Sequence, residues 1–321
     1  MNLLKAKALQ RGDTIGVVVP AGPLDRERID RALTRLHERG FRTRTYGNIW
    51  RSRGYLAGDD ATRAEELTAA FADPQTAAVW CARGGYGVVR LLERLDFELL
   101  RRHPKVFIGF SDITALHVAI HERTGLVIFH GPNLQDGFGK VEDMPSANES
   151  ALWRAVLAGN QRDDAQGYTL DFANMEHVEP RVVREGKAAG RLTGGNLAVL
   201  CGLMGTPFEI QTAGRILFLE DVSERLYRID RYLSQLWLAG KLQAAAGVLL
   251  GSFSYEDDEP AESETAVAAL LEEYFGRLNV PVLAGFPAGH GKHNLTLPIG
   301  ALIEFDADQK RVTVCENTVA C

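Results

Sequence analysis

Up to His130, the sequence alternates short apolar runs with amphipathic segments, and this alternation limits the possible folds more than any other feature. Apolar runs typical of buried strands cover 15–19, 78–82, 106–109 and 126–130, while 41–46 alternates as an edge strand does. Helical patterns follow at 24–39, 60–71, 88–95 and 113–123, the second with Asp60 as its expected cap. These repeated units predict an α/β fold with a mostly parallel, doubly wound sheet and a functional site at the carboxyl ends of its strands.

The pattern changes after Pro132. Residues 135–184 are rich in Asp, Glu, Asn and Gly, with one short helix expected near Trp153. From Gly186 onward the sequence is typical of an α+β domain, with a Gly-rich segment at 191–195, helices at 197–204, 229–239 and 266–278, strands at 215–219 and 247–250, and a hairpin over 302–314. We therefore expect an N-terminal domain over 1–150, a linker over 151–185 and a C-terminal domain over 186–321.

Charge and composition exclude several classes of partner. The chain has 36 Lys and Arg residues against 42 Asp and Glu residues, so its net charge of −6 does not attract nucleic acid or an anionic membrane. The four cysteines are scattered without a C-x-x-C pair, which argues against a metal cluster. The first residues lack the apolar region of a signal peptide, and no run reaches the ~18–20 apolar residues that cross a bilayer. We expect a cytoplasmic protein with a small-molecule or peptide partner.

Ser111 stands where a predicted strand runs directly into a predicted helix. A sharp turn at such a junction exposes the hydroxyl as a nucleophile, and the backbone N–H groups that follow can bind an oxyanion. The simpler alternative is that Ser111 or Asp112 only caps the helix, which is the commoner use of a serine at a helix start.

Two further segments carry groups that could activate a serine. The strand that begins at Arg215 ends in Glu220 and Asp221, either of which could orient a histidine, although both could also be a solvated strand end. His290 lies between two glycines, so its imidazole could project into a site and bond a carboxylate and a hydroxyl at once. It could equally be a mobile loop residue; His293 follows at a spacing that suggests metal, but no third ligand stands nearby in the sequence.

Residues 83–87, Arg-Gly-Gly-Tyr-Gly, separate a predicted strand from a predicted helix. Their backbone N–H groups could bind an anion, but the segment lacks the established phosphate-binding patterns, and a tight turn explains it equally well. His117 and His121 lie one helical turn apart without the H-E-x-x-H arrangement, so we assign them no role as zinc ligands.

Taken together, these motifs make the sequence similar to the LD-carboxypeptidase family of serine peptidases, whose members include muropeptide carboxypeptidases and microcin C resistance peptidases. The resemblance extends over nearly the whole chain, apart from 135–184. The matching segments are 12–15, 20–22, 83–87, 109–114, 130–132, 194–197, 205–207, 219–221, 227–231 and 289–291.

The resemblance implies a catalytic triad of Ser111, Glu220 and His290 in chain order. It implies hydrolysis of the bond before a terminal D-amino acid, typically releasing D-alanine from the tetrapeptide of recycled cell-wall muropeptides. It also implies an N-terminal domain of Rossmann-like type, a mixed C-terminal α+β domain and a homodimer.

The expected chemistry follows the logic of other serine peptidases. Ser111 attacks the carbonyl, His290 takes and returns the proton, and Glu220 orients the imidazole. The backbone N–H groups of Asp112 and Gly85 are candidates for the oxyanion hole, and Arg83 is a candidate for binding the substrate carboxylate. No metal or cofactor is expected.

Two alternatives remain open. A peptidase similar to those of microcin C resistance would use the same triad on a peptidyl or aminoacyl nucleotide, and an aromatic platform for a purine would favour it. A non-catalytic α/β ligand-binding protein would keep the fold, with Ser111 and His290 too far apart to hydrogen-bond.

Overall fold

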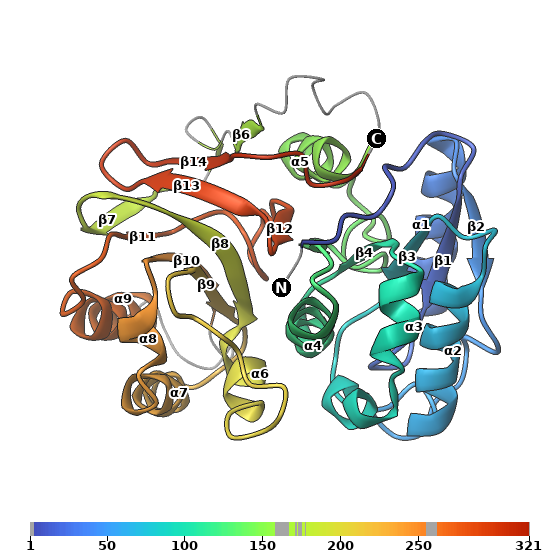
Figure 1. Ribbon diagram of the computed structural model, residues 1–321, viewed down its shortest axis with the longest axis horizontal. Coiled ribbons are helices and arrows are strands. Elements are labelled where there is room, and N and C mark those ends of the chain that lie inside the picture. The colour runs from blue at the N-terminus through green and yellow to red at the C-terminus, as the bar shows by residue number, and fades with distance from the viewer. Residues whose placement is uncertain are drawn as a thin grey trace. The chain divides into compact units, whose positions relative to one another are not determined.

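The structure is a computed structural model that describes residues 3–157, 167–170, 172, 175–176, 178–254 and 262–320. Its chain forms two compact units, each built around one sheet (Figure 1). Unit 1 contains Met1–Gln161, Thr296–Gly300 and Thr318–Cys321, and unit 2 contains Arg162–Leu295 and Ala301–Asn317.

The sheet of unit 1 has the strand order β12-β5-β4-β3-β1-β2. Its strands are β1 (Thr14–Val18), β2 (Arg42–Thr45), β3 (Ala78–Cys81), β4 (Val106–Gly109), β5 (Ile128–His130) and β12 (Leu297–Ile299). All neighbours pair in parallel except β12, which is antiparallel to β5. The strand–helix alternation of the sequence thus predicted the parallel strands of this sheet, including β2 at its edge, but not β12.

Helices connect these strands. They are α1 (Arg26–Glu38), α2 (Asp60–Ala72), α3 (Phe97–Arg102), α4 (Thr114–Thr124) and α5 (Ser146–Val156), with 3-10 helices η1 (Val88–Arg94) and η2 (Ser111–Ile113). Helix α1 begins at Asp25, whose carboxylate accepts the N–H of Arg28. Its buried residues Ile29, Ala32 and Leu36 repeat at helical spacing.

Two local predictions in unit 1 were wrong. The cap of α2 is Asp59 rather than Asp60, because Asp60 already lies within the helix and pairs there with Arg63 at 2.6 Å. Residues 88–94 form a 3-10 helix rather than an α-helix. The carboxylate of Asp112 accepts the N–H of Val88, directly after Gly87 in a left-handed conformation, and this start favours a short, tight turn.

The sheet of unit 2 has the order β6-β14-β13-β8-β9-β10-β11-β7. Its strands are β6 (Tyr168–Leu170), β7 (Arg181–Arg184), β8 (Lys187–Asn196), β9 (Ile216–Asp221), β10 (Gly247–Phe253), β11 (Val282–Ala284), β13 (Leu302–Asp306) and β14 (Arg311–Val314). Strands β8 to β11 are parallel, and the others pair antiparallel. This mixed sheet confirms the expected α+β character.

The helices of unit 2 are α6 (Leu197–Gly202), α7 (Leu226–Leu238), α8 (Lys241–Ala244) and α9 (Glu262–Phe275). In Figure 1, α7, α8 and α9 gather on one side of β9, β10 and β11. The Gly-rich segment at 191–195 is part of the long strand β8, which pairs with β9 and β13. Backbone pairing, with β13 over 187–191 and with β9 over 192–196, compensates for the low strand propensity of its glycines.

The expected linker over 151–185 is not a simple connection. It contains most of α5, whose Ala151, Leu152 and Ala155 are buried, and the strands β6 and β7, which pair with β14 and β11. Edge strands this short have too little sequence periodicity to be predicted, and their long-range partners determine them.

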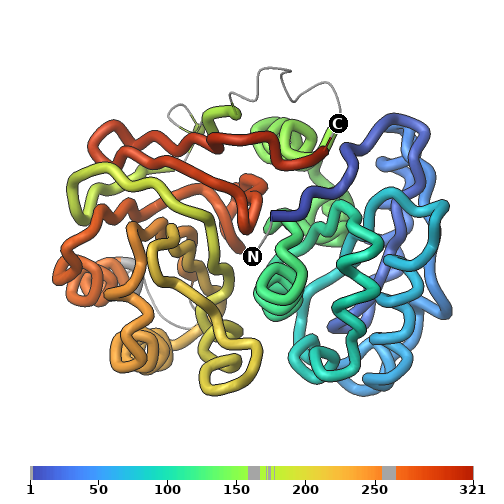
Figure 2. The backbone as a smooth tube through the Cα atoms, viewed as in Figure 1, coloured from blue at the N-terminus to red at the C-terminus, as the bar shows by residue number. Residues whose placement is uncertain are grey.

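Two short returns of the chain contradict the expected C-terminal domain over 186–321. Strand β12 belongs to the sheet of unit 1, and the C-terminal segment lies beside the N-terminal one (Figure 2). The N–H of Ala8 donates to the carbonyl of Ala320 at 2.8 Å, and the N–H of Ala320 donates to that of Ala6 at 2.7 Å. Both ends of the chain therefore complete unit 1.

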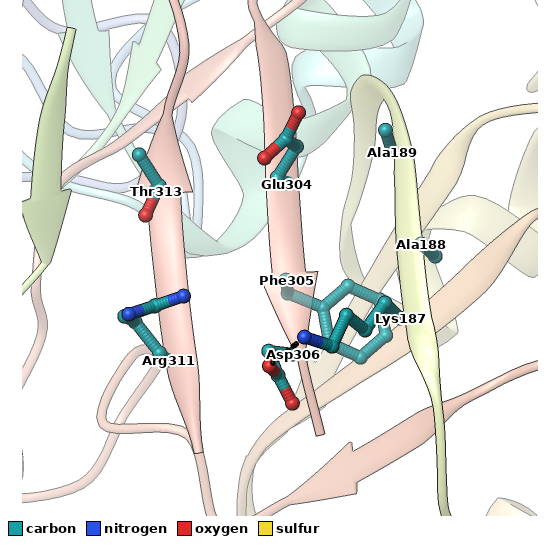
Figure 3. A pocket seen from close by; sticks show the side chains of 8 residues that line it. All are labelled: Lys187, Ala188, Ala189, Glu304, Phe305, Asp306, Arg311 and Thr313. Carbon is teal, nitrogen blue, oxygen red and sulfur yellow. Dashed lines mark ion pairs between the residues drawn. The ribbon is translucent and has the colours of Figure 1, made fainter. Parts of the chain in front are cut away.

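The face of unit 2 formed by β8, β13 and β14 holds a hollow of about 390 Å³ (Figure 3). Lys187 and Asp306 form an ion pair of 2.9 Å there, and Arg311 lies on the adjacent strand. None of the predicted site residues lines this hollow. Among the described helices, none combines the length and apolar character needed to span a bilayer.

Candidate active site

Ser111 has the backbone conformation of an exposed nucleophile. It follows β4 and has a φ of 68°, a left-handed value that residues other than glycine rarely adopt. Neither η2 nor α4 has a side-chain capping hydrogen bond, so Ser111 does not cap a helix. Backbone strain of this kind, ~1–3 kcal/mol, persists where the surrounding structure holds it and is typical of strand-to-helix nucleophile turns.

The surroundings of Ser111 are tightly packed. A Cβ atom at Gly84 would lie 2.9 Å from the Cβ of Ser111, so the loop that follows β3 can approach the serine only with glycine there. On the other side, buried Asn133 accepts the N–H of Phe110 at 3.2 Å. These contacts fix the turn that bears Ser111.

The side chain of Asp112 links two turns. Its buried carboxylate accepts the N–H of Val88 at 2.9 Å, which ties the turn after β4 to the start of η1. Burial raises the pKa of Asp112 to about 6, against the lowering effects of this hydrogen bond and of the Arg63 charge.

Arg63 holds two loops at the carboxyl edge of the sheet. Its guanidinium is fully buried and donates to the carbonyls of Pro20 and Gly87 and to the carboxylate of Asp60. The loop at 20–23 is also bound to the loop at 83–87, because the N–H of Gly22 donates to the carbonyl of Gly84. The motifs at 20–22, 83–87 and 109–114 therefore meet at one edge of one sheet, as parallel topology predicts.

The other two candidates of this edge lie in the same loop. Gly85 is exposed and has φ of 121°. Arg83 is half-buried, and its guanidinium donates to the carbonyl of Pro23. This hydrogen bond orients Arg83 and leaves other N–H groups of its guanidinium for a ligand.

Glu220 and His290 form a hydrogen-bonded pair in unit 2. Oε2 of Glu220 lies 2.6 Å from Nδ1 of His290. The carboxylate is fully buried at the end of β9, whereas the imidazole side chain is 16% exposed. Oε1 of Glu220 has no hydrogen-bond partner among the described residues. A buried carboxylate of this kind stabilises a protonated imidazole.

The loop around His290 is held by groups that sequence reasoning missed. The N–H of Gly291 donates to Oγ of Ser252 at 3.0 Å, and the N–H of Gly289 donates to Oδ1 of Asn294 at 3.1 Å. Gly289 has φ of 111°, and a Cβ there would lie 2.8 Å from Oε2 of Glu220. His290 is thus part of a fixed loop rather than a mobile one.

Asp221 has a different role from its neighbour. It accepts hydrogen bonds from Nδ2 of Asn196, the N–H of Ala198 and the N–H of Val222, which joins β9 to the start of α6. Burial, reinforced by the charge of Glu220, raises the pKa of Asp221 to about 7, although these hydrogen bonds lower it. The two acids point to opposite sides of the strand end, as alternation requires.

The described histidines outside this pair show no metal arrangement. His117 is fully buried beside Phe107, and burial lowers its pKa to about 3. Nδ1 of His121 contacts the carbonyl of Leu126, and Nε2 of His293 contacts the carbonyl of Glu176. In the part of the chain that the structure describes, no three His, Cys, Asp or Glu side chains cluster to hold a metal ion.

Ser111 thus lies in unit 1, whereas Glu220 and His290 lie in unit 2. A signal for some of the missed residues was present in the sequence. Asn133 directly follows the motif at 130–132, and Ser252 follows the predicted strand at 247–250. Polar residues at the ends of parallel strands are candidates for a common site.

Comparison with known proteins agrees with this arrangement. Residues 15–131 match the N-terminal domain of LD-carboxypeptidases, and residues 189–305 match their C-terminal domain. A probable murein peptide carboxypeptidase of Bacillus subtilis is 40% identical over 97% of this chain and 94% of its own length. The murein tetrapeptide carboxypeptidase of Pseudomonas aeruginosa is 32% identical over 92% of this chain and 94% of its own.

A solved structure is similar over the full length. The microcin C7 self-immunity protein MccF, in complex with aspartyl sulfamoyl adenosine, superposes with a TM-score of 0.87 at 27% identity, covering 99% of this chain and 100% of the other. The fold and these matches define a peptidase with an N-terminal α/β domain and a C-terminal mixed domain. The chain belongs to the LD-carboxypeptidase family.

Proposed function

We propose that this chain is a serine-type LD-carboxypeptidase that removes the terminal D-alanine from murein tetrapeptides. The observation that carries the proposal is the 2.6 Å hydrogen bond between buried Glu220 and Nδ1 of His290. The left-handed backbone of Ser111 and the relatives named as murein carboxypeptidases support it.

In this mechanism Nε2 of His290 takes the proton of Ser111 Oγ as the oxygen attacks the scissile carbonyl. Backbone N–H groups of Asp112 and Gly85 bind the oxyanion, each contributing ~3–4 kcal/mol in comparable sites. Protonated His290, stabilised by Glu220, then gives its proton to the leaving D-alanine nitrogen. Water, deprotonated by His290, hydrolyses the acyl-enzyme and restores Ser111. Arg83 binds the terminal carboxylate of the substrate.

Mass spectrometry of the tetrapeptide L-Ala-γ-D-Glu-meso-diaminopimelate-D-Ala after incubation with the enzyme tests the proposal. We expect loss of one D-alanine, no cleavage of the analogue that ends in L-alanine, and no effect of EDTA. Equal cleavage of the two peptides would contradict the stereospecificity, and loss of activity in EDTA that zinc restores would contradict the serine mechanism.

A second candidate is cleavage of an aminoacyl or peptidyl nucleotide, favoured by the full-length similarity to MccF bound to aspartyl sulfamoyl adenosine. Parallel assays on the tetrapeptide and on an aminoacyl adenylate separate the two. A non-catalytic ligand-binding protein would turn over neither and would not react with a fluorophosphonate serine probe.

A cytoplasmic location and a homodimer belong to the same proposal and rest on the family resemblance. Cell fractionation tests the location. Sedimentation equilibrium at micromolar concentration tests the dimer, and a single species of 35.3 kDa would contradict it.

A further inference from the structure

Two large aromatic side chains are exposed together in unit 1. Tyr55 is 64% exposed and Tyr86 is 52% exposed. Their rings contact each other edge to face, with centroids 5.6 Å apart and planes at 66°. Exposed aromatic pairs are uncommon away from binding surfaces, because two rings that touch still leave much apolar surface in water.

Tyr55 is held in place by its backbone. It stands with Gly54 at the tip of a two-residue turn, in which the N–H groups of Arg53 and Leu56 each donate to the carbonyl of the other at 2.8 and 3.2 Å. The next residue, Ala57, donates to the carbonyl of Ala21 at 2.9 Å. The turn is therefore attached to the loop at 20–23.

Tyr86 belongs to the loop that packs on Ser111. Gly84 lies against the serine side chain, and two residues of chain span at most about 7 Å, so the Cα of Tyr86 is within about 7 Å of the Cα of Gly84. The hydrogen bond from Gly22 to Gly84 joins this loop to the loop at 20–23, to which the Tyr55 turn is attached. Both rings are thus presented by the loops that surround Ser111.

We propose that Tyr55 and Tyr86 form a subsite for the amino sugar that is linked to the stem peptide of a murein substrate. A pyranose ring has C–H groups on its face and hydroxyls on its edge, and it suits an aromatic face beside a phenolic hydroxyl. The scissile carbonyl of the tetrapeptide is separated from the sugar by three residues, or about 10 Å of extended chain, which is the reach expected from Ser111 past Tyr86. The edge-to-face arrangement offers no pair of parallel rings between which a purine could be sandwiched.

This inference deepens the proposed function and depends on it for the identity of the peptide. Calorimetric titration with N-acetylmuramyl-L-Ala-D-isoglutamine and with L-Ala-D-isoglutamine tests it without catalysis, since neither ligand contains the scissile bond. We expect the sugar-bearing ligand to bind at least about tenfold more tightly, and Tyr55→Ala and Tyr86→Ala each to remove most of that difference. Leu238→Ala, which removes an exposed apolar side chain from α7 in unit 2, is the matched control and should leave the difference unchanged.

A kinetic comparison links the subsite to turnover. We compare kcat/KM for muramyl tetrapeptide with kcat/KM for free tetrapeptide. In Tyr86→Ala the ratio of the two should fall about tenfold because KM for the muramyl substrate rises. In Tyr86→Phe the ratio should be retained. Equal affinity of the wild-type protein for the two dipeptide ligands overturns the inference, and so does tyrosine-dependent binding of adenosine monophosphate in place of the sugar. If no tetrapeptide is cleaved, the proposed function fails, while the calorimetric result still decides whether the sugar subsite exists.

Discussion

Ser111 combines a reactive position with an unfavourable backbone conformation, and substitution can separate the two. In Ser111→Gly the strain of the left-handed backbone is released, so we expect the free energy of unfolding to rise by up to about 1 kcal/mol. Ser111→Ala keeps the strain and should not change stability. Both variants should lose at least about 10⁴-fold in kcat. Thermal melts and kinetic assays on the same preparations measure both effects.

Lys310→Gly is the control, because Lys310 also has a positive φ, of 50°, in the hairpin turn of unit 2. It should become more stable without a change in kcat. Had Ser111 been a helix cap, Ser111→Ala would cost about 0.5–2 kcal/mol and leave kcat unchanged, the opposite result.

Glu220 and Asp221 are adjacent acids with different partners, and kinetics should distinguish them. Glu220→Gln keeps the shape of the side chain but removes the charge that stabilises protonated His290. We expect kcat to fall roughly 10²–10⁴-fold. Asp221→Asn should change kcat by less than about tenfold, because Asp221 bonds Asn196, Ala198 and Val222 rather than the imidazole. If Asp221→Asn is the inactive variant, the acid of the triad is misassigned.

The pKa of Asp221, raised to about 7, predicts a pH dependence of stability. The unfolded carboxyl titrates near ~4, so between about pH 4 and 7 the folded state binds more protons than the unfolded state. Stability contributed by this group is therefore complete below about pH 4 and is lost as the pH rises towards 7.

Urea unfolding of the wild-type protein and of Asp221→Asn from pH 4 to 8 measures this loss. As the pH rises, the wild-type protein should lose up to about 1.4 kcal/mol per pH unit of stability relative to the variant. The difference should stay constant above about pH 7. The same comparison with Asp112→Asn should level off near pH 6, since the pKa of Asp112 is raised to about 6. A difference that is independent of pH would show that the buried acids titrate normally.

At the scale of elements, α2 stabilises the loops around Ser111 through Arg63. Arg63→Met removes the side-chain donor to the carbonyl of Pro20 and one of the two donors to that of Gly87, which also accepts the N–H of Arg90. We expect a loss of about 2–5 kcal/mol of unfolding free energy. Arg90→Met is the matched control, since Arg90 pairs with the same Asp60 but is 41% exposed. It should cost less than about 1 kcal/mol, as measured by urea unfolding.

Arg63→Lys tests the positioning role separately. Lysine keeps the charge but cannot reach three acceptors in one plane, so kcat should fall while the variant remains folded. A folded Arg63→Lys variant with wild-type kcat would show that the loop positions do not depend on this side chain.

Elements with strong local periodicity were predictable from the sequence, and those that depend on distant partners were not. Strand β4 was predicted with its observed bounds, because an apolar run that starts after Lys105 and ends at Gly109 is too short for a helix. Strand β12 contains Pro298, which argues against a strand, and it forms only because the sheet edge beside β5 tolerates a residue without an N–H.

Some residues of the candidate site could likewise be predicted from the sequence, and others could not. Glu220 was chosen over Asp221 by side-chain reach, alternation along a strand and the family motif, and the structure places it against His290. Asn133 and Ser252 bond residues 23 and 39 positions away in the sequence, so no local pattern could assign their partners, whereas Asn294 bonds nearby Gly289. The left-handed φ of Ser111 is likewise set by packing against Gly84.

At the scale of the whole molecule, the last residues support the first. Deletion of 318–321 removes the hydrogen bonds between Ala320 and residues 6 and 8. It also exposes to water the surface against which buried Val319 packs. We expect a loss of about 2–5 kcal/mol in unit 1 and loss of hydrogen-exchange protection at the N–H of Ala8. Protection of β9 and β10 in unit 2 should not change. Hydrogen exchange read by mass spectrometry measures both.

Gln309→Ala, at the exposed hairpin tip of unit 2, is the control and should leave the protection of Ala8 unchanged. Retained protection at Ala8 in the deletion variant would mean that the pairing with Ala320 contributes nothing.

The return of the chain to β12 also orders events during synthesis. The ribosome makes the nucleophile-bearing strand and the turn at Ser111 early, but residues 297–299, which close the edge of that sheet, emerge only after Glu220 and His290 have been translated. At bacterial or eukaryotic elongation rates the interval is on the order of ten seconds. During that time the edge of β5 is open, and a nascent chain with its serine in place still lacks the strand that completes its sheet. The sheet behind Ser111 is therefore closed only after both proposed partners of the serine have been translated.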